Sequence, residues 1–389
     1  MKFKKLMALG LSLSMTMGLA ACSGGQTTQS AAPSSSGGEG GGDAQGMKIA
    51  IVTSPNTVDD GSFNENNYDG IVSFIESRGN IDTVTPVQEP TGDPSAAAQT
   101  VADIVADYDV LVCTGFQFAG IATVAEENPE KKFILVDSFP SDAEGNEVEV
   151  ENVYAMQFAE QESGFFAGVA AALETKTGKV AVVNGVAYPS NVNYQYGFES
   201  GVNYASKNLG ATAEVVELPS YAGTDVTGAN VGGNYSGNFS DEATGKVIGN
   251  ALIQQGVDVI FVAAGASGNG VFTAAKESNG AAMVIGCDVD QYDDGANGDS
   301  NIILTSVLKN MAVNVERQLN AIVDGSFKGG NYTLYADTDS TGYVSEEGRQ
   351  QMSADTISML DELYPKVKDG TIKPASNFNG YTPDDFPGL

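Results

Sequence analysis

The residue types available for chemistry narrow the functions open to this chain of 389 residues. It contains no histidine and three cysteines, Cys22, Cys113 and Cys287. Without histidine there is no Ser-His-Asp or Cys-His nucleophile pair and no His-ligated zinc. Three cysteines cannot build a disulfide framework or a four-thiolate metal site. Any chemistry must therefore rest on carboxylates, Lys, Tyr and Ser.

Polar loops with aromatic residues follow several predicted buried strands. These loops span residues 54–64, 114–118, 137–140, 264–270 and 288–290. In open parallel sheets, ligands bind beyond the carboxyl ends of the strands. A lining that mixes amides, glycines and aromatic rings is typical of a cleft for a neutral polar molecule. The sequence therefore predicts a binding cleft built from these loops.

Two of these loops superficially resemble other kinds of site. The run Gly265-Ala-Ser-Gly-Asn-Gly270 lacks both the order of a dinucleotide fingerprint and the Gly-Lys-Ser/Thr ending of a P-loop. In an EF-hand reading from Asp290, Tyr292 falls on the third position and Asn301 on the twelfth, so the calcium pattern fails. No two acids are placed convincingly around a scissile bond, as a hydrolase requires. We predict no catalytic residue, no metal and no cofactor.

The elements that position the loops alternate between strand and helix. The predicted strands are 48–53, 84–88, 109–113, 133–137, 153–158, 180–184, 212–218, 257–263 and 282–287. The predicted helices are 64–78, 94–106, 118–127, 161–173, 192–208, 241–255 and 270–277. Continuous apolar strands between helices indicate parallel sheets covered on both faces. At this length, two doubly wound α/β lobes are more natural than one very wide sheet.

Composition and charge exclude further classes. The chain is 42% hydrophobic and 18% charged, which suits a soluble protein with a core. It has 19 Lys and Arg against 50 Asp and Glu, a formal net charge of -31. Such a surface repels nucleic acid and anionic lipid headgroups. We therefore expect no nucleic-acid partner.

The N-terminus has the pattern of an export signal. Three lysines precede an uncharged apolar stretch from Leu6 to Ala21, too short to span a bilayer and ending in small residues. Leu19-Ala-Ala-Cys22 resembles the bacterial lipobox, in which the cysteine is lipidated. We predict a signal peptide at 1–21, and an anchor cysteine with a Gly/Ser tether at 22–46. The protein would then reach the membrane only through this anchor, on the extracytoplasmic face.

Six motifs, in order, resemble the basic membrane protein family of substrate-binding lipoproteins. The first is Val58-Asp-Asp-Gly-Ser-Phe-Asn64, in which Glu65 follows where the family has Gln, and Tyr68-Asp-Gly70 stands for Trp-Glu-Gly. The others are Gly197-Phe-Glu-Ser-Gly201, Asn234-Tyr-Ser-Gly-Asn-Phe-Ser-Asp241, residues 259–270, Ile285-Gly-Cys-Asp-Val-Asp-Gln291 and Leu304-Thr-Ser-Val-Leu-Lys309. The resemblance extends from Met47 to the C-terminus.

The resemblance implies a fold, a function and partners. Family members have two α/β lobes of the type I periplasmic binding protein kind, joined by three crossovers. We expect an N-terminal lobe at 47–158 plus 288–328, and a C-terminal lobe at 159–287 plus 329–389. The best-known members are purine nucleoside receptors of ABC transporters. The implied partners are a nucleoside-like ligand and the permease and ATPase subunits, and we expect a monomer.

The same motifs imply a set of ligand-binding residues. Phe63 and Phe239 match the two aromatics that sandwich the base. Asn64, Asp288 and Lys309 match ligands of the ribose hydroxyls, and Gly265 matches a backbone contact. Asp137 matches, more loosely, the acid at the base edge. Independently of the family, two π-faces suit any flat heterocycle, and a carboxylate with an ammonium can hold a vicinal diol.

One departure leaves the ligand open. Ser54 stands nine residues before Phe63, where nucleoside-binding members carry Asp. Loss of that acceptor would change the preferred base or the ligand class, such as a sugar or a flavin-like compound. A second reading is a ligand-sensing lipoprotein of the same fold that feeds a signalling receptor.

Overall fold

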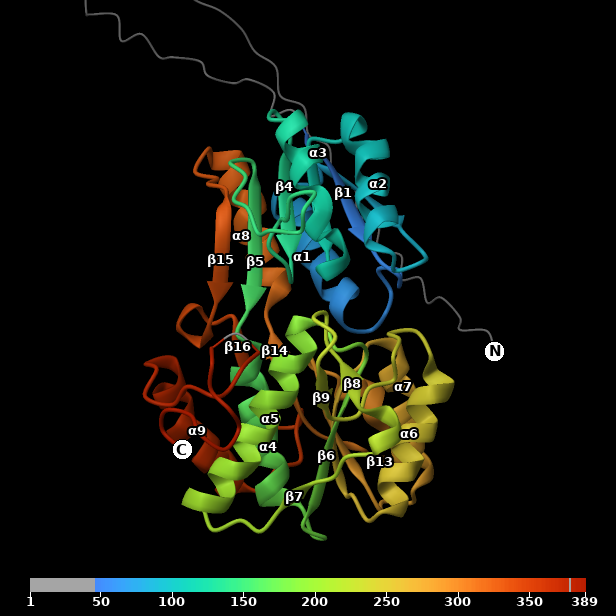
Figure 1. The fold of residues 1–389 in the computed structure, drawn as a ribbon, viewed down its shortest axis with the longest axis vertical. Coiled ribbons are helices and arrows are strands. Elements are labelled where there is room, and N and C mark those ends of the chain that lie inside the picture. Colours follow the sequence, from blue (N-terminus) through green and yellow to red (C-terminus); the bar gives the residue numbers. More distant parts are fainter. Residues whose placement is uncertain (1–45, 378) are drawn as a thin grey trace, which may run out of the picture. The chain divides into compact units, whose positions relative to one another are not determined.

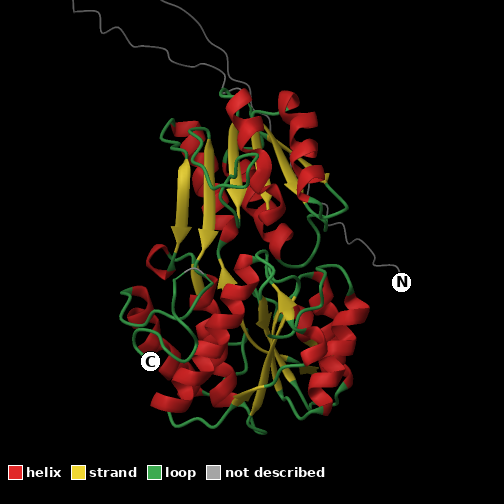
Figure 2. Ribbon diagram, viewed as in Figure 1, coloured by secondary structure: helices red, strands yellow, loops and turns green. Residues whose placement is uncertain are grey.

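The computed structural model describes residues 46–377 and 379–389. Within them lie two six-stranded sheets, each with helices on both faces (Figures 1 and 2). The predicted signal peptide, Cys22 and nearly all of the tether lie outside the described residues.

The first sheet has the strand order β15-β5-β4-β3-β1-β2, and its paired strands are all parallel. Its strands are β1 (Lys48–Thr53), β2 (Thr83–Gln88), β3 (Val110–Thr114), β4 (Lys132–Val136), β5 (Val153–Phe158) and β15 (Gly330–Leu334). Its helices are α1 (Phe63–Ser77), α2 (Pro94–Ile104), α3 (Ala122–Glu127) and α8 (Met311–Asp324), with 3₁₀ turns η1 (Val105–Asp107) and η2 (Phe116–Ile121).

Side-chain alternation along β1 explains the two covered faces of this sheet. Ile49 and Ile51 pack toward α1 and α8, whereas Ala50 and Val52 pack toward α2 and η2. Because successive side chains of a strand point to opposite faces, a continuous apolar run requires cover on both. The prediction of buried parallel strands is confirmed here.

The second sheet has the order β16-β14-β11-β10-β6-β7. Its strands are β6 (Lys179–Asn184), β7 (Glu214–Val215), β10 (Val259–Ala263), β11 (Met283–Gly286), β14 (Ile303–Lys309) and β16 (Thr341–Tyr343). Its helices are α4 (Glu160–Glu174), α5 (Pro189–Asn208), α6 (Glu242–Gln254), α7 (Ala266–Glu277) and α9 (Ala354–Lys368). The edge strand β16 runs antiparallel to β14, a departure from the expected all-parallel sheet.

The lobe of the second sheet also contains short hairpins and 3₁₀ turns. Two small hairpins are β8 (Gly223–Thr224) with β9 (Asn230–Gly232), and β12 (Ala296–Asn297) with β13 (Ser300–Asn301). The 3₁₀ turns are η3 (Pro219–Tyr221), η4 (Asp293–Gly295) and η5 (Ala336–Thr338). Helices α4, α5 and α9 cover one face of the sheet, and α6 and α7 the other.

The chain passes between the sheets three times. It leaves the first sheet after β5, returns after β14 and crosses again after β15. The expected architecture of two α/β lobes with a three-crossover connection is confirmed.

The expected lobe boundaries were wrong at two places. Residues 288–309 belong with the second sheet, because β14 pairs with β11 and buries Ile303 and Leu304 in that lobe's core. The segment 330–334 belongs with the first sheet, because β15 pairs with β5. An apolar run predicts a strand, but the sheet that it joins depends on packing between distant segments.

Candidate functional site

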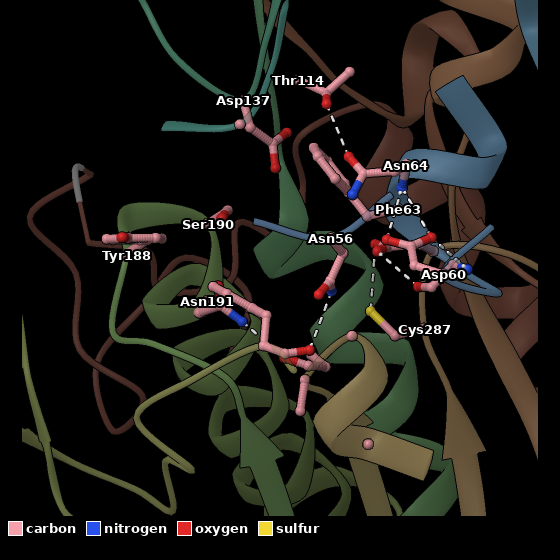
Figure 3. Close-up of a pocket in the computed structure, with 18 of the residues that line it drawn as sticks. Asn56, Asp60, Phe63, Asn64, Thr114, Asp137, Tyr188, Ser190, Asn191 and Cys287 are labelled. Atoms are coloured by element: carbon pink, nitrogen blue, oxygen red, sulfur yellow. Dashed lines mark hydrogen bonds between the residues drawn. The ribbon is translucent and has the colours of Figure 1, made fainter. Parts of the chain in front are cut away.

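A cavity of about 830 Å³, open to solvent, lies at the carboxyl ends of both sheets. All eight residues singled out from the sequence line it: Ser54, Phe63, Asn64, Asp137, Phe239, Gly265, Asp288 and Lys309. Figure 3 shows side chains from both lobes around this space.

The strand order of the first sheet arranges polar groups along one edge of the cavity. The three crossovers between the lobes, after β5, β14 and β15, are here called the hinge. Moving outward from it, the residues at or just after the ends of β5, β4, β3 and β1 are Glu160, Asp137, Thr114 and Ser54, of which all but Glu160 line the cavity. Gln117 lies in η2, just after β3, and its amide Nε2 donates to the Ser54 carbonyl at 3.2 Å. The strand-end residues of this sheet therefore change from acidic near the hinge to uncharged farther out.

The second sheet repeats that gradient. Moving outward, the residues at the ends of β14, β11, β10 and β6 are Lys309, Asp288, Gly265 and Gly185. Both charged residues again lie on the hinge side. By these strand-end residues the cavity has a charged inner half and an uncharged outer half. Asp60, in the loop after β1, is a further carboxylate of the lining, and its charge interacts with that of Asp288 in the inner half.

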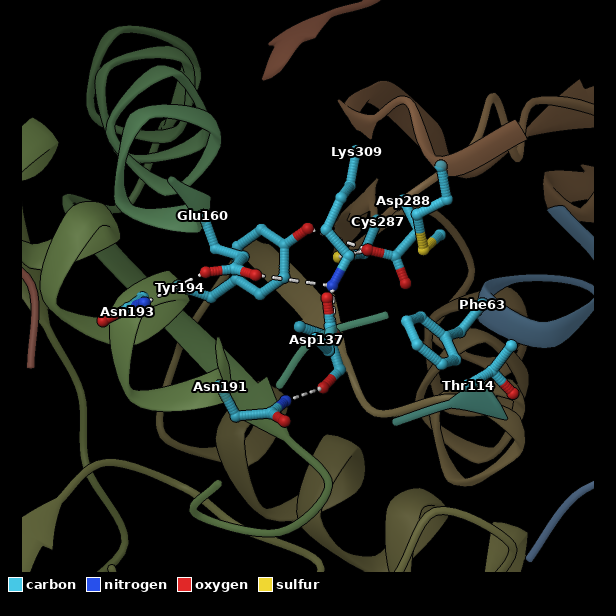
Figure 4. Close-up of polar contacts among 12 residues, drawn as sticks. Phe63, Thr114, Asp137, Glu160, Asn191, Asn193, Tyr194, Cys287, Asp288 and Lys309 are labelled. Atoms are coloured by element: carbon cyan, nitrogen blue, oxygen red, sulfur yellow. Dashed lines mark hydrogen bonds and ion pairs between the residues drawn. The ribbon is translucent and has the colours of Figure 1, made fainter. Parts of the chain in front are cut away.

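Lys309 is the centre of the charged half. Its ammonium Nζ lies 2.5 Å from Asp137 Oδ2 and 3.5 Å from Glu160 Oε1, and only 2% of the side chain is exposed (Figure 4). Burial alone would lower the pKa of Lys309, but the carboxylates of Asp137, Asp288 and Glu160 raise it. The ammonium therefore stays charged. It also lies 4.9 Å from the ring centroid of Phe63, a cation–π contact.

Three carboxylates share this one ammonium. Burial raises the pKa of Asp137, opposed by Lys309 and reinforced by Asp288. Burial also raises the pKa of Glu160 to about 7, although Lys309 and a hydrogen bond from Asn193 favour its ionised form. The excess of acid over base means that the cluster repels anions and accepts hydrogen bonds from neutral groups.

Asp137 was expected at the base edge, but the structure pairs it with Lys309. Its second oxygen, Oδ1, is buried and has no hydrogen-bond partner among the described residues. A buried carboxylate oxygen without a donor is costly. It is therefore available to accept a hydrogen bond from a ligand.

Asp288 occupies the corresponding position in the other lobe. It accepts hydrogen bonds from the Tyr194 hydroxyl at 2.8 Å and, across the cavity, from the Ser62 hydroxyl at 3.3 Å. Asp137 and Asp288 both have positive φ, +64° and +70°. This conformation is uncommon for residues other than glycine. It is often found where function demands a fixed side-chain direction.

The start of α1 fixes Phe63 and Asn64. The carboxylate of Asp60 accepts hydrogen bonds from the backbone N–H groups of Ser62, Asn64 and Glu65 at 3.1 to 3.2 Å. These are donors that a helix leaves free at its N-terminus. The Asn64 Oδ1 accepts from the Thr114 hydroxyl at 2.8 Å, which leaves its amide hydrogens to donate.

Phe239 belongs to an aromatic row in the outer half. Its ring centroid lies 6.0 Å from that of Tyr188, which lies 5.2 Å from that of Phe116 in the other lobe. The Asn56 amide donates to the Phe239 carbonyl at 3.2 Å, again across the cavity. Sequence reasoning missed Tyr188, Asn56 and Gln117. Asn56, Phe116 and Gln117 lie in loops that it marked, whereas Tyr188 had no such signal.

Ser54 and Gly265 occupy the outer half in different ways. The Ser54 hydroxyl donates to Glu89 Oε2 at 2.8 Å, so it is turned toward a residue that does not line the cavity. Gly265 has a φ of +53°, and a Cβ there would lie 3.3 Å from the Phe239 carbonyl oxygen. Its backbone therefore approaches the ligand space closely because it has no side chain.

Within residues 46–377 and 379–389, no group of three or more Cys, Asp or Glu residues is arranged to hold a metal ion. No helix within these residues is long and apolar enough to cross a membrane.

Comparison with known protein families shows to which family this chain belongs. A family model described as "ABC transporter substrate-binding protein PnrA-like" matches residues 47–219 and 227–373. The chain belongs to this family, Bmp. It is accordingly a solute-binding protein of the ABC-transporter type rather than an enzyme.

Curated relatives and a solved structure agree with this assignment. The CD4+ T-cell-stimulating antigen of Listeria monocytogenes is 30% identical over 84% of this chain and 87% of its own length. The ABC transporter nucleoside-binding protein BmpA of Lactococcus lactis is 29% identical over 74% of this chain and 78% of its own. An ABC transporter solute-binding protein from Aeropyrum pernix shares the fold, with a TM-score of 0.69 at 24% identity, over 86% of this chain and 94% of that one.

Proposed function

We propose that this Bmp-family protein binds a nucleoside in the cavity between its lobes and delivers it to an ABC importer. The observation that carries the proposal is the two-part cavity. A charged half offers the unpartnered Asp137 Oδ1 and the Lys309 ammonium, and an uncharged half is walled by Phe239 and its aromatic neighbours. A nucleoside has the matching halves, a hydroxyl-bearing sugar and a flat base.

The charge of the inner half favours a nucleoside over a nucleotide. Asp137, Glu160 and Asp288 outnumber the single ammonium of Lys309. A phosphate brought into this cluster would be repelled by carboxylates in a low-dielectric environment. The nucleoside-binding protein of Lactococcus among the relatives supports the same ligand class.

The predicted lipoprotein anchor completes the proposal. Lipidation at Cys22 would hold the binding lobes at the extracytoplasmic membrane face, where the permease and ATPase subunits receive the ligand. The protein acts as a monomer in this scheme. A sensor of the same fold would bind the same ligand but pass it to no permease.

Ligand screening by thermal shift and calorimetry tests the proposal. The panel contains adenosine, inosine, guanosine, cytidine and uridine, with ribose, free adenine, AMP and riboflavin as comparisons. We expect at least one nucleoside to stabilise the folded protein by RT ln(1 + [L]/Kd) and so to raise its melting temperature. The same nucleoside should reduce the radius of gyration as the lobes close. AMP should bind at least tenfold more weakly than adenosine. Binding of ribose or riboflavin in preference to every nucleoside would refute the proposal.

A further inference from the structure

Beside the outer half of the cavity, where the sequence suggested a missing acceptor, lies a buried carboxylate that does not line the cavity. Glu89 follows β2 at the outer edge of the first sheet and is 2% exposed. Its oxygens accept hydrogen bonds from the Ser54 hydroxyl, the Thr91 hydroxyl and amide, and the Gly92 amide, at 2.5 to 2.8 Å. Although burial opposes ionisation, these donors hold the pKa of Glu89 below its usual value.

A carboxylate that is saturated by its own neighbours is not available to a ligand. Glu89 does not line the cavity, and the Ser54 hydroxyl in front of it is already used as a donor. An acid at position 54 would face Glu89 at hydrogen-bonding distance, and two carboxylates that close repel each other. The uncharged residue at this position is therefore explained by its neighbour Glu89.

Gln117 is the polar side chain that remains in front of Ser54. It lines the cavity and is 4% exposed. Its Nε2 donates to the Ser54 carbonyl at 3.2 Å, which fixes the amide plane. Among the described residues it makes no other side-chain hydrogen bond, so Oε1 and the second amide hydrogen remain available. A fixed amide presents one acceptor and one donor side by side.

The neighbours of Gln117 place this amide beside the aromatic part of the cavity. Phe116 precedes it in η2, and the row Phe116–Tyr188–Phe239 continues across the cavity. Asn56, also uncharged, joins the same region through its bond to the Phe239 carbonyl. Since the charged groups lie at the hinge side, a nucleoside would place its sugar inward and its base outward, toward Gln117.

We infer that Gln117 reads the edge of the base, and that this protein recognises the base through a neutral amide rather than a carboxylate. The inference rests on the proposed nucleoside function. An amide can pair with adenine, which offers a donor next to an acceptor nitrogen, as Asn and Gln do in other adenine contacts. A carboxylate only accepts, so it favours bases with an N1–H donor and disfavours the N1 lone pair of adenine.

The test compares adenosine with inosine, which differ at N1 and C6 of the base. We expect Gln117→Glu to shift the ratio of the two dissociation constants at least tenfold toward inosine. The matched control is Gln254→Glu, the same change at an exposed residue of α6, which should leave the ratio unchanged. Calorimetry gives the dissociation constants, and the melting temperature without ligand reports whether each variant is folded.

A second variant keeps the inference testable if Gln117→Glu does not fold. Gln117→Met keeps the side-chain length and removes both hydrogen-bonding groups, and should weaken adenosine and inosine at least fivefold each. An unchanged ratio in folded Gln117→Glu, or unchanged affinities in Gln117→Met, would overturn the assignment of Gln117. Failure of the wild-type protein to bind any nucleoside would instead reject the proposed function itself.

Discussion

The ammonium of Lys309 and the carboxylate of Asp137 form an ion pair between the lobes, with Nζ 2.5 Å from Oδ2. Lys309 ends β14 of the second sheet, and Asp137 follows β4 of the first. Both side chains line the ligand cavity. The same contact therefore joins the lobes and lies in the lining of the candidate binding cavity.

Removal of the lysine should destabilise the protein strongly. In Lys309→Met, the carboxylates of Asp137 and Glu160 lose the one ion-pair partner that they have among the described residues, and Asp288 loses a nearby positive charge. We expect a loss of about 3–5 kcal/mol in unfolding free energy. Chemical denaturation measures it. The double variant Lys309→Met with Asp137→Asn should recover part of the loss. If the single variant costs less than about 1 kcal/mol, the cluster does not depend on this charge.

Unfolding free energy should fall as pH rises from about 5 to 7.5. Burial raises the pKa values of Glu160, Glu162 and Glu199 from 4.5 to about 7 in the folded protein. Between those values the folded state binds more protons than the unfolded state, so stability decreases with increasing pH. Below 4.5 both states are protonated and these groups add no further change. Urea denaturation at several pH values measures the slope.

Glu199→Gln should remove the contribution of one carboxyl group to this pH dependence. The loss of unfolding free energy between pH 5 and 7.5 should then be smaller by about 2 kcal/mol. Gln195 donates to Glu199 Oε1 at 2.8 Å, and the amide oxygen of the variant can keep this bond. The exposed Glu242→Gln is the matched control, since its side chain lies at the surface at the start of α6. A slope of opposite sign in the wild type would contradict the burial argument.

The two halves of the cavity should lose different properties on mutation. Phe239→Ala should weaken binding of every nucleoside by a similar 1–3 kcal/mol, roughly, because every base has a π-face. Asp288→Ala should instead erase the preference for ribosides over free bases and deoxy analogues, because the Asp288 carboxylate is an acceptor in the charged half. Calorimetry with one riboside, its free base and its deoxy analogue separates the two. If Asp288→Ala weakened the binding of the riboside and of its free base equally, Asp288 would have a structural role only.

Gly185→Ala should reproduce the binding loss of Phe239→Ala without unfolding the protein. A Cβ at Gly185, directly after β6, would lie 2.2 Å from the Phe239 ring. Because Phe239 is only partly buried, we expect its ring to be displaced rather than the strand. The double variant should bind no more weakly than Phe239→Ala alone. Gly120→Ala is the control, because its Cβ would meet only the Ala98 side chain at 3.8 Å. Additive losses in the double variant would mean that Gly185 acts independently of Phe239.

Cys22→Ala should release the protein from the membrane fraction while leaving ligand binding unchanged. The expectation follows from the apolar signal and the Leu19-Ala-Ala-Cys22 motif. Membrane fractionation followed by calorimetry of the released protein measures both properties. Continued tight membrane association of the variant would rule out lipid anchoring at Cys22.

The sequence by itself determined many of the elements and eight residues of the cavity lining. Apolar runs such as 48–53 specify strands buried on both faces, and the polar residues after them, such as Asp137 and Asp288, then fall at the carboxyl ends of the strands. This follows because side-chain periodicity can be read from the local sequence, and because the carboxyl ends of parallel strands lie at the same edge of a sheet.

Only the tertiary structure decided which residues meet. Lys309 and Asp137 are 172 positions apart, and no local pattern distinguishes Asp137 from Asp288 as its partner. Packing between distant segments likewise decided which sheet β14 joins. It also decided that the Ser54 hydroxyl donates to Glu89. Burial periodicity is a property of each strand alone, whereas strand order and ion pairing depend on the free energy of the assembled core. The fold class was therefore predictable from the sequence, while the division of the cavity into charged and uncharged halves was not.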